Sequence, residues 1–224
     1  MNEKKEKIIF SWSTGKDSTM ALHEILKNDK YQVVSLLTTV TRDYDRVTMH
    51  GIRRELLEEQ AESLGLPLEI FYISPSATNE EYERQMGKSL MSFQQKGVTA
   101  VAFGDIFLED LRKYREDKLA LIGMRGIFPL WKCDTTGLIR NFVDQGFKAI
   151  ITCVDSRIMG KEFAGRSIDT NFLESLPKGI DPAGENGEYH SFAFDGPIFN
   201  KKIKFSIGNV VLRDAFYFCD LVPE

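Results

Sequence analysis

Short apolar runs alternate with amphipathic stretches over the first 131 residues. We expect strands at the apolar runs, which are 7–12, 31–40, 66–73, 98–105 and 127–131. We expect helices at the stretches between them, which are 18–27, 51–65, 79–97 and 108–123. The runs "VVSLL" and "AVAF" are apolar without period-2 alternation, which is typical of strands covered on both faces. The pattern therefore predicts an α/β domain with a doubly wound parallel sheet.

Glycines mark several of the predicted helix ends. Gly65, Gly97 and Gly126 each follow a helical stretch, where a left-handed C-terminal cap is expected. These positions support the predicted boundaries.

The pattern changes after residue 131. One more helix (135–146) and strand (147–155) are followed by a tract rich in Gly and Pro, in which the βα rhythm stops. We expect strands at 188–199, 201–207 and 211–222, joined by turns. Two domains are predicted, a doubly wound α/β domain at 1–131 and a smaller C-terminal α+β domain at 132–224.

Composition narrows the function classes. The 224 residues are 42% apolar and 28% charged with a net charge of −4, as in an ordinary soluble globular chain. No apolar run is long enough for a membrane span, and the charged N-terminus "MNEKKEK" is unlike a signal peptide. We therefore expect a cytoplasmic protein that binds neither membrane nor nucleic acid.

The three cysteines offer no framework for a disulfide, zinc or iron–sulfur site. Cys133, Cys153 and Cys219 are far apart, odd in number and outside any C-x-x-C pair. We expect them to act as buried small hydrophobic residues.

The segment "FSWSTGKDST" (10–19) lies between the first predicted strand and the first predicted helix, where α/β proteins bind ligands. A Walker A loop needs a glycine five positions before Gly15 and Ser or Thr after Lys16, but Phe10 and Asp17 stand there. A G-x-G-x-x-G fingerprint is also missing. Both common phosphate loops are excluded.

The hexapeptide Ser13–Ser18 resembles the S-G-G-x-D-S signature of the PP-loop ATP pyrophosphatases, which cleave ATP between the α and β phosphates. Small residues let the backbone approach phosphate, and the helix N-terminus favours negative charge. Asp17 beside a polyphosphate implies a bridging cation, so we expect it to bind Mg²⁺. A capped helix start with an acidic first turn would explain the same residues without any ligand.

Thr14 departs from the signature, which has Gly at this position. Either the turn does not need positive φ here, or the loop carries strain of about 1–2 kcal/mol.

Other stretches narrow the resemblance. "HGIRRELLEEQAESLGLPL", "VTAVAFGDI", "FPLW" and above all "DPAGENGEYHSFAFDGPIF" resemble the diphthine–ammonia ligase family. The resemblance implies a HUP-type domain that binds ATP with Mg²⁺ and a C-terminal domain that closes over the site. It also implies that a carboxylate is adenylated and that ammonium then supplies the nitrogen of an amide. "GDIFLEDLRKYRE" and "FPLWKCDT" look more like bacterial relatives, which occur where diphthine is absent, so the acceptor carboxylate stays open.

The resemblance and the strand ends together define the expected site. The expected nucleotide-binding residues are Ser11, Ser13, Thr14, Gly15, Lys16, Asp17, Ser18, Leu37, Thr38, His50 and Gly104. The expected catalytic residues are Lys16, Asp17, Asp105, Glu185 and Glu188, with Asp17 as the metal ligand. The expected acceptor-binding residues are Glu109, Arg112, Asn186, Gly187 and His190. If a helix begins near Asp105, then Asp105, Glu109 and Arg112 share one face of it.

The motif "GENGEYH" leaves its own chemistry open. Glu185 and Glu188 can bind Mg²⁺ or can bind and deprotonate ammonium. His190 is in step with Phe192 and Phe194, which equally fits a structural role. The family's usual pattern has a Cys where Ala183 stands, so a thiol cannot act there.

Three other functions remain open. A tRNA-thiolating PP-loop enzyme would want paired cysteines and a basic surface, which this chain lacks. A hydrolase that releases AMP and pyrophosphate would share the nucleotide half, and a HUP-type regulator would bind nucleotide without turnover. The prediction is an AMP-forming amide ligase that can form a homodimer.

Overall fold

The computed structural model describes residues 5–224, which form two compact units. The first contains residues 5–13, Asp17–Asp45 and Leu66–Lys132, and the second contains Thr14–Lys16, Arg46–Gly65 and Cys133–Glu224. Two short segments of the N-terminal half, Thr14–Lys16 and Arg46–Gly65, belong to the second unit. The predicted domain boundary at 131/132 stays a prediction.

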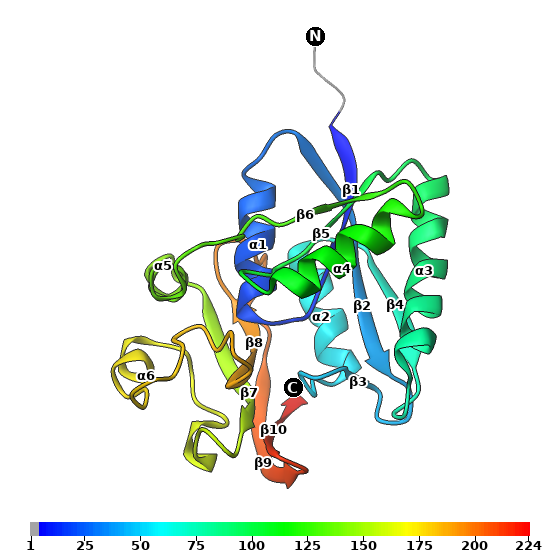
Figure 1. Ribbon diagram of the computed structural model, residues 1–224. Helices are drawn as coiled ribbons and strands as arrows, with labels where there is room; N and C mark the ends of the chain where they lie inside the picture. The colour runs from blue at the N-terminus through cyan, green and yellow to red at the C-terminus, as the bar shows by residue number, and fades with distance from the viewer. Residues whose placement is uncertain (1–4) are drawn as a thin grey trace. The chain divides into compact units, whose positions relative to one another are not determined.

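A parallel sheet forms the centre of the first unit (Figure 1). Its strands run in the order β4 (Leu68–Ile73), β2 (Tyr31–Thr41), β1 (Glu6–Ser11), β5 (Ala100–Ala102) and β6 (Arg125–Ile127). The order reverses between β1 and β5, which makes the carboxyl ends of these two strands the topological switch point. The predicted α/β class with a parallel sheet is confirmed.

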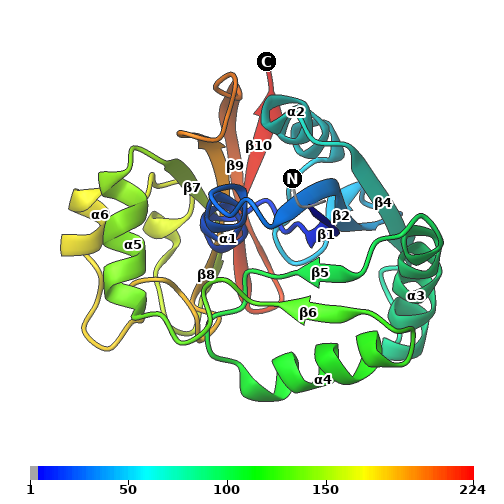
Figure 2. The same cartoon turned by 90° about the horizontal axis from the view of Figure 1, so that it is seen from above.

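Helices lie on both sides of this sheet. α1 (Lys16–Leu26) and α3 (Asn79–Gln95) lie on opposite sides of β1 and β2 (Figures 1 and 2). Leu90 of α3 and Leu119 of α4 (Glu109–Ala120) pack against the sheet residues Ile9, Leu37, Val101 and Phe103. The apolar strands are covered on both faces, which is why they lack alternation.

The second unit is built on an antiparallel sheet in the order β8-β7-β10-β9. Its strands are β7 (Lys148–Asp155), β8 (Tyr189–Asp195), β9 (Phe205–Arg213) and β10 (Phe216–Pro223). The unit also contains β3 (Arg46–Val47), α2 (Arg54–Leu64), α5 (Thr135–Asp144), a 3-10 turn (Lys161–Phe163) and α6 (Thr170–Glu174). The smaller C-terminal sheet was therefore predicted correctly as an additional part of the fold.

Three local predictions were wrong. The expected strand 127–131 overlaps β6 at Ile127 alone. The expected strand 211–222 is a hairpin, because Asp214 takes φ 53 and turns the chain between β9 and β10. Gly126 lies within β6, and α4 ends at Ala120 before Gly123, which has φ 67. Gly65 with φ 66 and Gly97 with φ 82 do close α2 and α3 as left-handed residues.

Candidate functional site

The loop that leaves β1 at the switch point is closely packed. The Ser13 and Ser18 hydroxyls lie 2.9 Å apart and share a hydrogen bond. A Cβ on Gly104, which follows β5, would lie 2.9 Å from the Ser18 nitrogen, so only glycine allows this approach. Ser13, Ser18 and Gly104 are therefore brought together within the first unit, where an α/β sheet binds ligands.

Two expected residues on β2 hold the start of this loop. Leu37 pairs with Ser11 in register and its carbonyl accepts a hydrogen bond from the Trp12 nitrogen at 2.9 Å. The Thr38 hydroxyl donates to the Trp12 carbonyl at 2.9 Å. The Thr38 hydroxyl is thus engaged by the backbone, which supports a positioning role for this side chain.

Thr14 stands where the PP-loop signature has glycine, and its backbone conformation shows whether the loop needs positive φ there. Its φ is 74, so the loop needs a left-handed residue and uses a β-branched one, at a cost of about 1–2 kcal/mol. The side chain is fully buried, and its hydroxyl makes no hydrogen bond within residues 5–224. The loop is therefore strained at this position.

Residues 14–16 contact strand β8 within the second unit. The Ala193 nitrogen donates to the Thr14 carbonyl at 2.9 Å, and the Lys16 nitrogen donates to the Ser191 hydroxyl at 3.2 Å. The buried Lys16 ammonium lies 5.1 Å from the centre of the Tyr189 ring, within range of a cation–π interaction. The loop and the strand that follows "GENGE" are thereby joined across 175 positions of sequence.

His50 packs directly on this loop. A Cβ on Gly15 would lie 2.9 Å from His50 Cε1, and the His50 and His190 rings are 4.8 Å apart. His50 Nδ1 lies 3.1 Å from the Ser191 carbonyl. Burial, with Lys16 nearby and against the Ser191 hydrogen bond, lowers the pKa of His50 to about 4. The ring is therefore neutral at pH 7, and Nδ1 carries the proton that is donated to Ser191.

The motif "GENGEYH" forms a turn around the Glu188 carboxylate. Its two oxygens accept hydrogen bonds from the nitrogens of Asp181 and Asn186 and from the Asn186 side-chain amide, at 2.9–3.0 Å. Asp181 in turn accepts from the nitrogens of Ala183 and Glu185. Glu188 is 3% exposed, and this geometry supports a role in shaping the turn.

Other residues of this motif differ in exposure. Asn186 is exposed, Glu185 and Gly187 are half-buried, and Gly187 takes φ 86 with open space around it. Ala183 is buried, so the position where the family has Cys is filled by a methyl group. His190 lies in β8, and its ring is beside that of His50.

Asp105 lies at the carboxyl end of β5 with its side chain 14% exposed. Oδ2 lies 3.2 Å from Arg115 Nε, but makes no hydrogen bond within residues 5–224. Burial raises the pKa of Asp105, Arg115 lowers it, and the Asp17 carboxylate raises it further. Two carboxylates of the first unit therefore lie close enough to repel each other.

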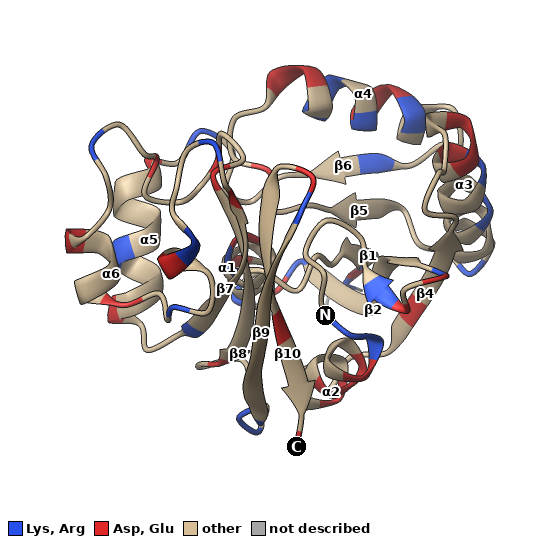
Figure 3. Cartoon of the chain, turned by 90° about the horizontal axis from the view of Figure 1, so that it is seen from below, with Lys and Arg blue, Asp and Glu red and all other residues tan. Residues whose placement is uncertain are grey.

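Glu109 and Arg112 do not share a helix face with Asp105, although the sequence had suggested that they would. α4 begins at Glu109 and not near Asp105, so the spacing argument fails. Glu109 is exposed and lies 3.6 Å from Lys132, while Arg112 binds Glu116 and stacks on the Phe128 and Trp131 rings. Acidic and basic residues are interspersed along this helix (Figure 3). Their expected role in acceptor binding stays a prediction.

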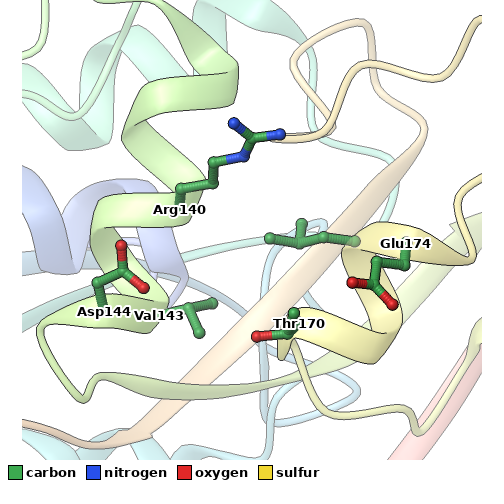
Figure 4. A pocket seen from close by; sticks show the side chains of 6 residues that line it. Arg140, Val143, Asp144, Thr170 and Glu174 are labelled. Atoms are coloured by element: carbon green, nitrogen blue, oxygen red, sulfur yellow. The ribbon is translucent and has the colours of Figure 1, made fainter.

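A pocket of about 400 Å³ lies elsewhere in the second unit, between α5 and α6 (Figure 4). Its lining is Arg140, Val143 and Asp144 from α5 with Thr170, Leu173 and Glu174 from α6. None of the residues expected at the nucleotide site lines it.

The cysteines and the helices add three further observations. Cys153 and Cys219 are buried as expected, but Cys133 is exposed. No helix among residues 5–224 is long and apolar enough to cross a bilayer. The same residues contain no cluster of three or more His, Cys, Asp or Glu side chains suited to a metal ion.

Sequence reasoning missed three residues that hold the loop, namely Gln60, Tyr189 and Ser191. The burial of Gln60 could have been predicted from the sequence, because it continues the buried face of α2 formed by Leu56 and Leu57. A polar side chain at such a position needs buried hydrogen-bond partners. Tyr189 and Ser191 had no signal beyond their place next to His190.

The strand order and the glycine-containing loop at its switch point define a doubly wound α/β protein. Family models extend this. Residues 6–126 match the diphthamide synthase N-terminal domain and residues 134–220 match the diphthamide synthase C-terminal domain. The chain belongs to the diphthamide synthase family.

The chain is also similar to several diphthine–ammonia ligases. The chain is 25% identical over 230 residues to a diphthine–ammonia ligase of Danio rerio, covering 91% of this chain and 89% of the relative. It is 23% identical to one of Mus musculus, covering 91% and 84%. It is 25% identical to one of Schizosaccharomyces pombe over 96% of this chain, but spans only 38% of that relative.

One solved structure is also similar. It is described as a predicted subunit of tRNA methyltransferase from Methanocaldococcus jannaschii, with 18% identity and a TM-score of 0.45, covering 88% of this chain and 100% of that chain.

Proposed function

We propose that this protein is an ATP-dependent ligase that adenylates a carboxylate and converts it to an amide with ammonium. Its family and the ligase names of its relatives support an enzyme that uses ATP and ammonia. The acceptor carboxylate is left open, and diphthine is one candidate among others.

One observation carries the proposal: the phosphate loop and the C-terminal motif meet within the second unit. Lys16 of the loop contacts Ser191 through its backbone nitrogen and Tyr189 through its ammonium. A loop alone would support nucleotide binding. Contact with the strand that continues "GENGE" supports a reaction in which the bound nucleotide and the motif act together.

Asp17 and Asp105 fit a magnesium ion. Both are carboxylates, the ligand type that Mg²⁺ prefers, and they are close enough to raise the pKa of Asp105. Asp105 Oδ2, which lacks a hydrogen bond within residues 5–224, could be satisfied by such an ion. Mg²⁺ usually takes one or two carboxylates with water and phosphate oxygens, so a larger protein cluster is not required. The ion would neutralise triphosphate charge.

The proposed reaction has two steps, adenylation and amide formation. An acceptor carboxylate oxygen attacks the α-phosphorus, the α–β bridging bond breaks, and pyrophosphate leaves. NH₄⁺ gives up a proton to a base in the solvent, and the resulting ammonia attacks the acyl carbon. The nitrogen then loses a second proton to solvent as it becomes the amide. The bond from that carbon to the phosphate oxygen breaks, and AMP leaves with an oxygen of the original carboxylate.

This chain's residues would act mainly by position and charge. The N–H groups of the loop and Lys16 would bind the phosphates, because phosphoryl transfer needs neutralised charge and alignment more than covalent help. Neutral His50 would keep its Nδ1 proton on Ser191 and so hold β8 against the loop. The turn around Glu188 would present Glu185 and Asn186 for the acceptor or ammonium.

The test is acceptor-dependent turnover. The protein is incubated with ATP, Mg²⁺, NH₄⁺ and a panel of carboxylates in H₂¹⁸O, and AMP is analysed by mass spectrometry. A ligase yields AMP without ¹⁸O, because the new oxygen comes from the acceptor, and the yield rises with NH₄⁺. AMP that carries ¹⁸O and forms without any acceptor would indicate a hydrolase instead.

Asp17→Ala tests the proposed role of Asp17 in the same assay. We expect it to abolish AMP formation, because the loop loses its metal carboxylate, while its thermal unfolding stays close to that of the wild type. Asp29→Ala, at an exposed carboxylate paired with Lys5, serves as the control and should turn over normally. Full activity of Asp17→Ala would remove Asp17 from the proposed site.

A further inference from the structure

Gln60 is a buried polar residue on an otherwise apolar helix face. It lies on α2 beside Leu56 and Leu57, and its side chain is fully buried. A buried amide is stable only when its groups are hydrogen-bonded. Its partners therefore indicate what it does.

The Gln60 amide joins the phosphate loop to β8. Nε2 donates to the Thr14 carbonyl at 3.0 Å and to the Ala193 carbonyl at 2.6 Å. Two carbonyl partners require the nitrogen on this side, which fixes the orientation of the amide. The Thr14 carbonyl accepts a second hydrogen bond from the Ala193 nitrogen.

These bonds set the direction of one peptide group. The carbonyl of Thr14 and the N–H of Gly15 belong to the same planar peptide and point in opposite directions. When Gln60 and Ala193 hold the carbonyl on their side, the Gly15 N–H is directed to the other side. A loop N–H with that direction is the kind of donor that binds phosphate at a helix N-terminus.

The strain at Thr14 makes this fixation necessary. Relaxation of Thr14 from φ 74 toward negative φ would turn its carbonyl away from Gln60 and Ala193, so the hydrogen bonds to this carbonyl oppose the relaxation. We propose that Gln60 is a positioning residue for nucleotide binding, which holds the strained Thr14–Gly15 peptide in its anion-binding orientation and ties it to β8. This role rests on the proposed ATP-dependent function.

A double-mutant cycle tests the proposal. Gln60→Met keeps the side-chain length but removes both donors, and we expect it to weaken ATP binding by about tenfold, or ~1.4 kcal/mol. In the Thr14→Gly background, positive φ no longer carries a steric penalty. There the same change should weaken binding by less than about threefold, ~0.6 kcal/mol.

The control is Gln145→Met, which removes an amide that binds Asn141 on α5 and should leave ATP affinity unchanged. Equal losses from Gln60→Met in the wild-type and Thr14→Gly backgrounds would overturn the proposal, because the amide would then contribute only to general packing.

A second measurement needs no variant and no nucleotide. Hydrogen exchange of the wild-type protein should show protection of the Lys16 and Ala193 amides, since the loop is held on β8 before ATP arrives. Rapid exchange at both amides would overturn the positioning role. If the wild type is protected but binds no ATP, the proposed function fails while the fixation of the loop by Gln60 stands.

Discussion

Asp105 is a mostly buried carboxyl group whose pKa is raised by burial and by Asp17. Between its ordinary value and the raised one, the folded state holds a proton that the unfolded state has released. The free energy of unfolding therefore falls as pH rises through this window.

We expect Asp105→Asn to remove this fall. Without metal, the variant should be more stable than the wild type at pH 7 and equally stable below the ordinary carboxyl pKa of 3.8, as measured by urea unfolding. Its AMP formation should need more Mg²⁺. A variant less stable than the wild type at pH 7 would contradict the assigned environment of this carboxyl group.

His50 predicts the opposite pH dependence. Its pKa is about 4 in the folded protein against 6.5 as the ordinary value, with Lys16 and His190 as the neighbouring ionisable groups. The unfolded state binds the proton first, so the free energy of unfolding decreases as pH falls from about 6.5 to 4, by at most roughly 3 kcal/mol. In His50→Gln, this part of the pH dependence should disappear. If the free energy of unfolding of His50→Gln still fell with pH as steeply as that of the wild type, the lowered pKa of His50 would be contradicted.

At this scale, the sequence predicted residue types better than their roles. The resemblance of residues 13–18 to a phosphate loop could be seen from their order, because such a loop is a local structure, and their binding role stays a prediction. The strain at Thr14 was one of two alternatives that sequence could not separate. Glu188 was expected to be a catalytic carboxylate. The three hydrogen bonds that it accepts from the turn are visible only in the structure.

The turn of residues 181–188 shows how an element is shaped by its glycines. Gly184 takes φ 70, and a Cβ there would lie 2.9 Å from the Tyr189 ring and 3.0 Å from the Tyr189 carbonyl. Gly187 takes φ 86, but a Cβ there would meet nothing within 4 Å. The two positions share the backbone penalty and differ only in contact.

We therefore expect Gly184→Ala to lower the free energy of unfolding by roughly 1–3 kcal/mol more than Gly187→Ala. The Tyr189 ring must move, and Lys16 loses its aromatic neighbour, so turnover should fall as well. Thermal or urea unfolding of both variants measures the difference. Equal stabilities would show that Tyr189 gives way without cost.

Elements covered on both faces were predictable, and elements defined by distant contacts were not. β1, β2 and β5 contain continuous apolar runs, so their positions and parallel arrangement followed from the pattern. β6 is Arg-Gly-Ile and overlaps the expected strand 127–131 only at Ile127. The hairpin at Asp214 was missed because Asp-Ala is a weak turn signal and the flanking residues are uniformly β-prone. The link from Lys16 to Ser191 spans 175 positions, and no local pattern encodes it.

At the scale of the whole molecule, the family and the arrangement of the two motifs support a common reaction class. The N- and C-terminal family models cover most of the chain, and residues 14–16 of the loop pack with the C-terminal sheet in one compact unit. Under the proposed function, the acceptor would be selected by the surface around the motif "GENGEYH". It is therefore less transferable between relatives at about 25% identity than the use of ATP.

The proposed ligase reaction cleaves ATP between its α and β phosphates. It is tested most directly by ³¹P NMR of the products formed from ATP and Mg²⁺ with NH₄⁺ and the acceptor panel. We expect AMP and pyrophosphate in equal amounts, both lost in Asp17→Ala. ADP and phosphate as the main products would contradict this claim.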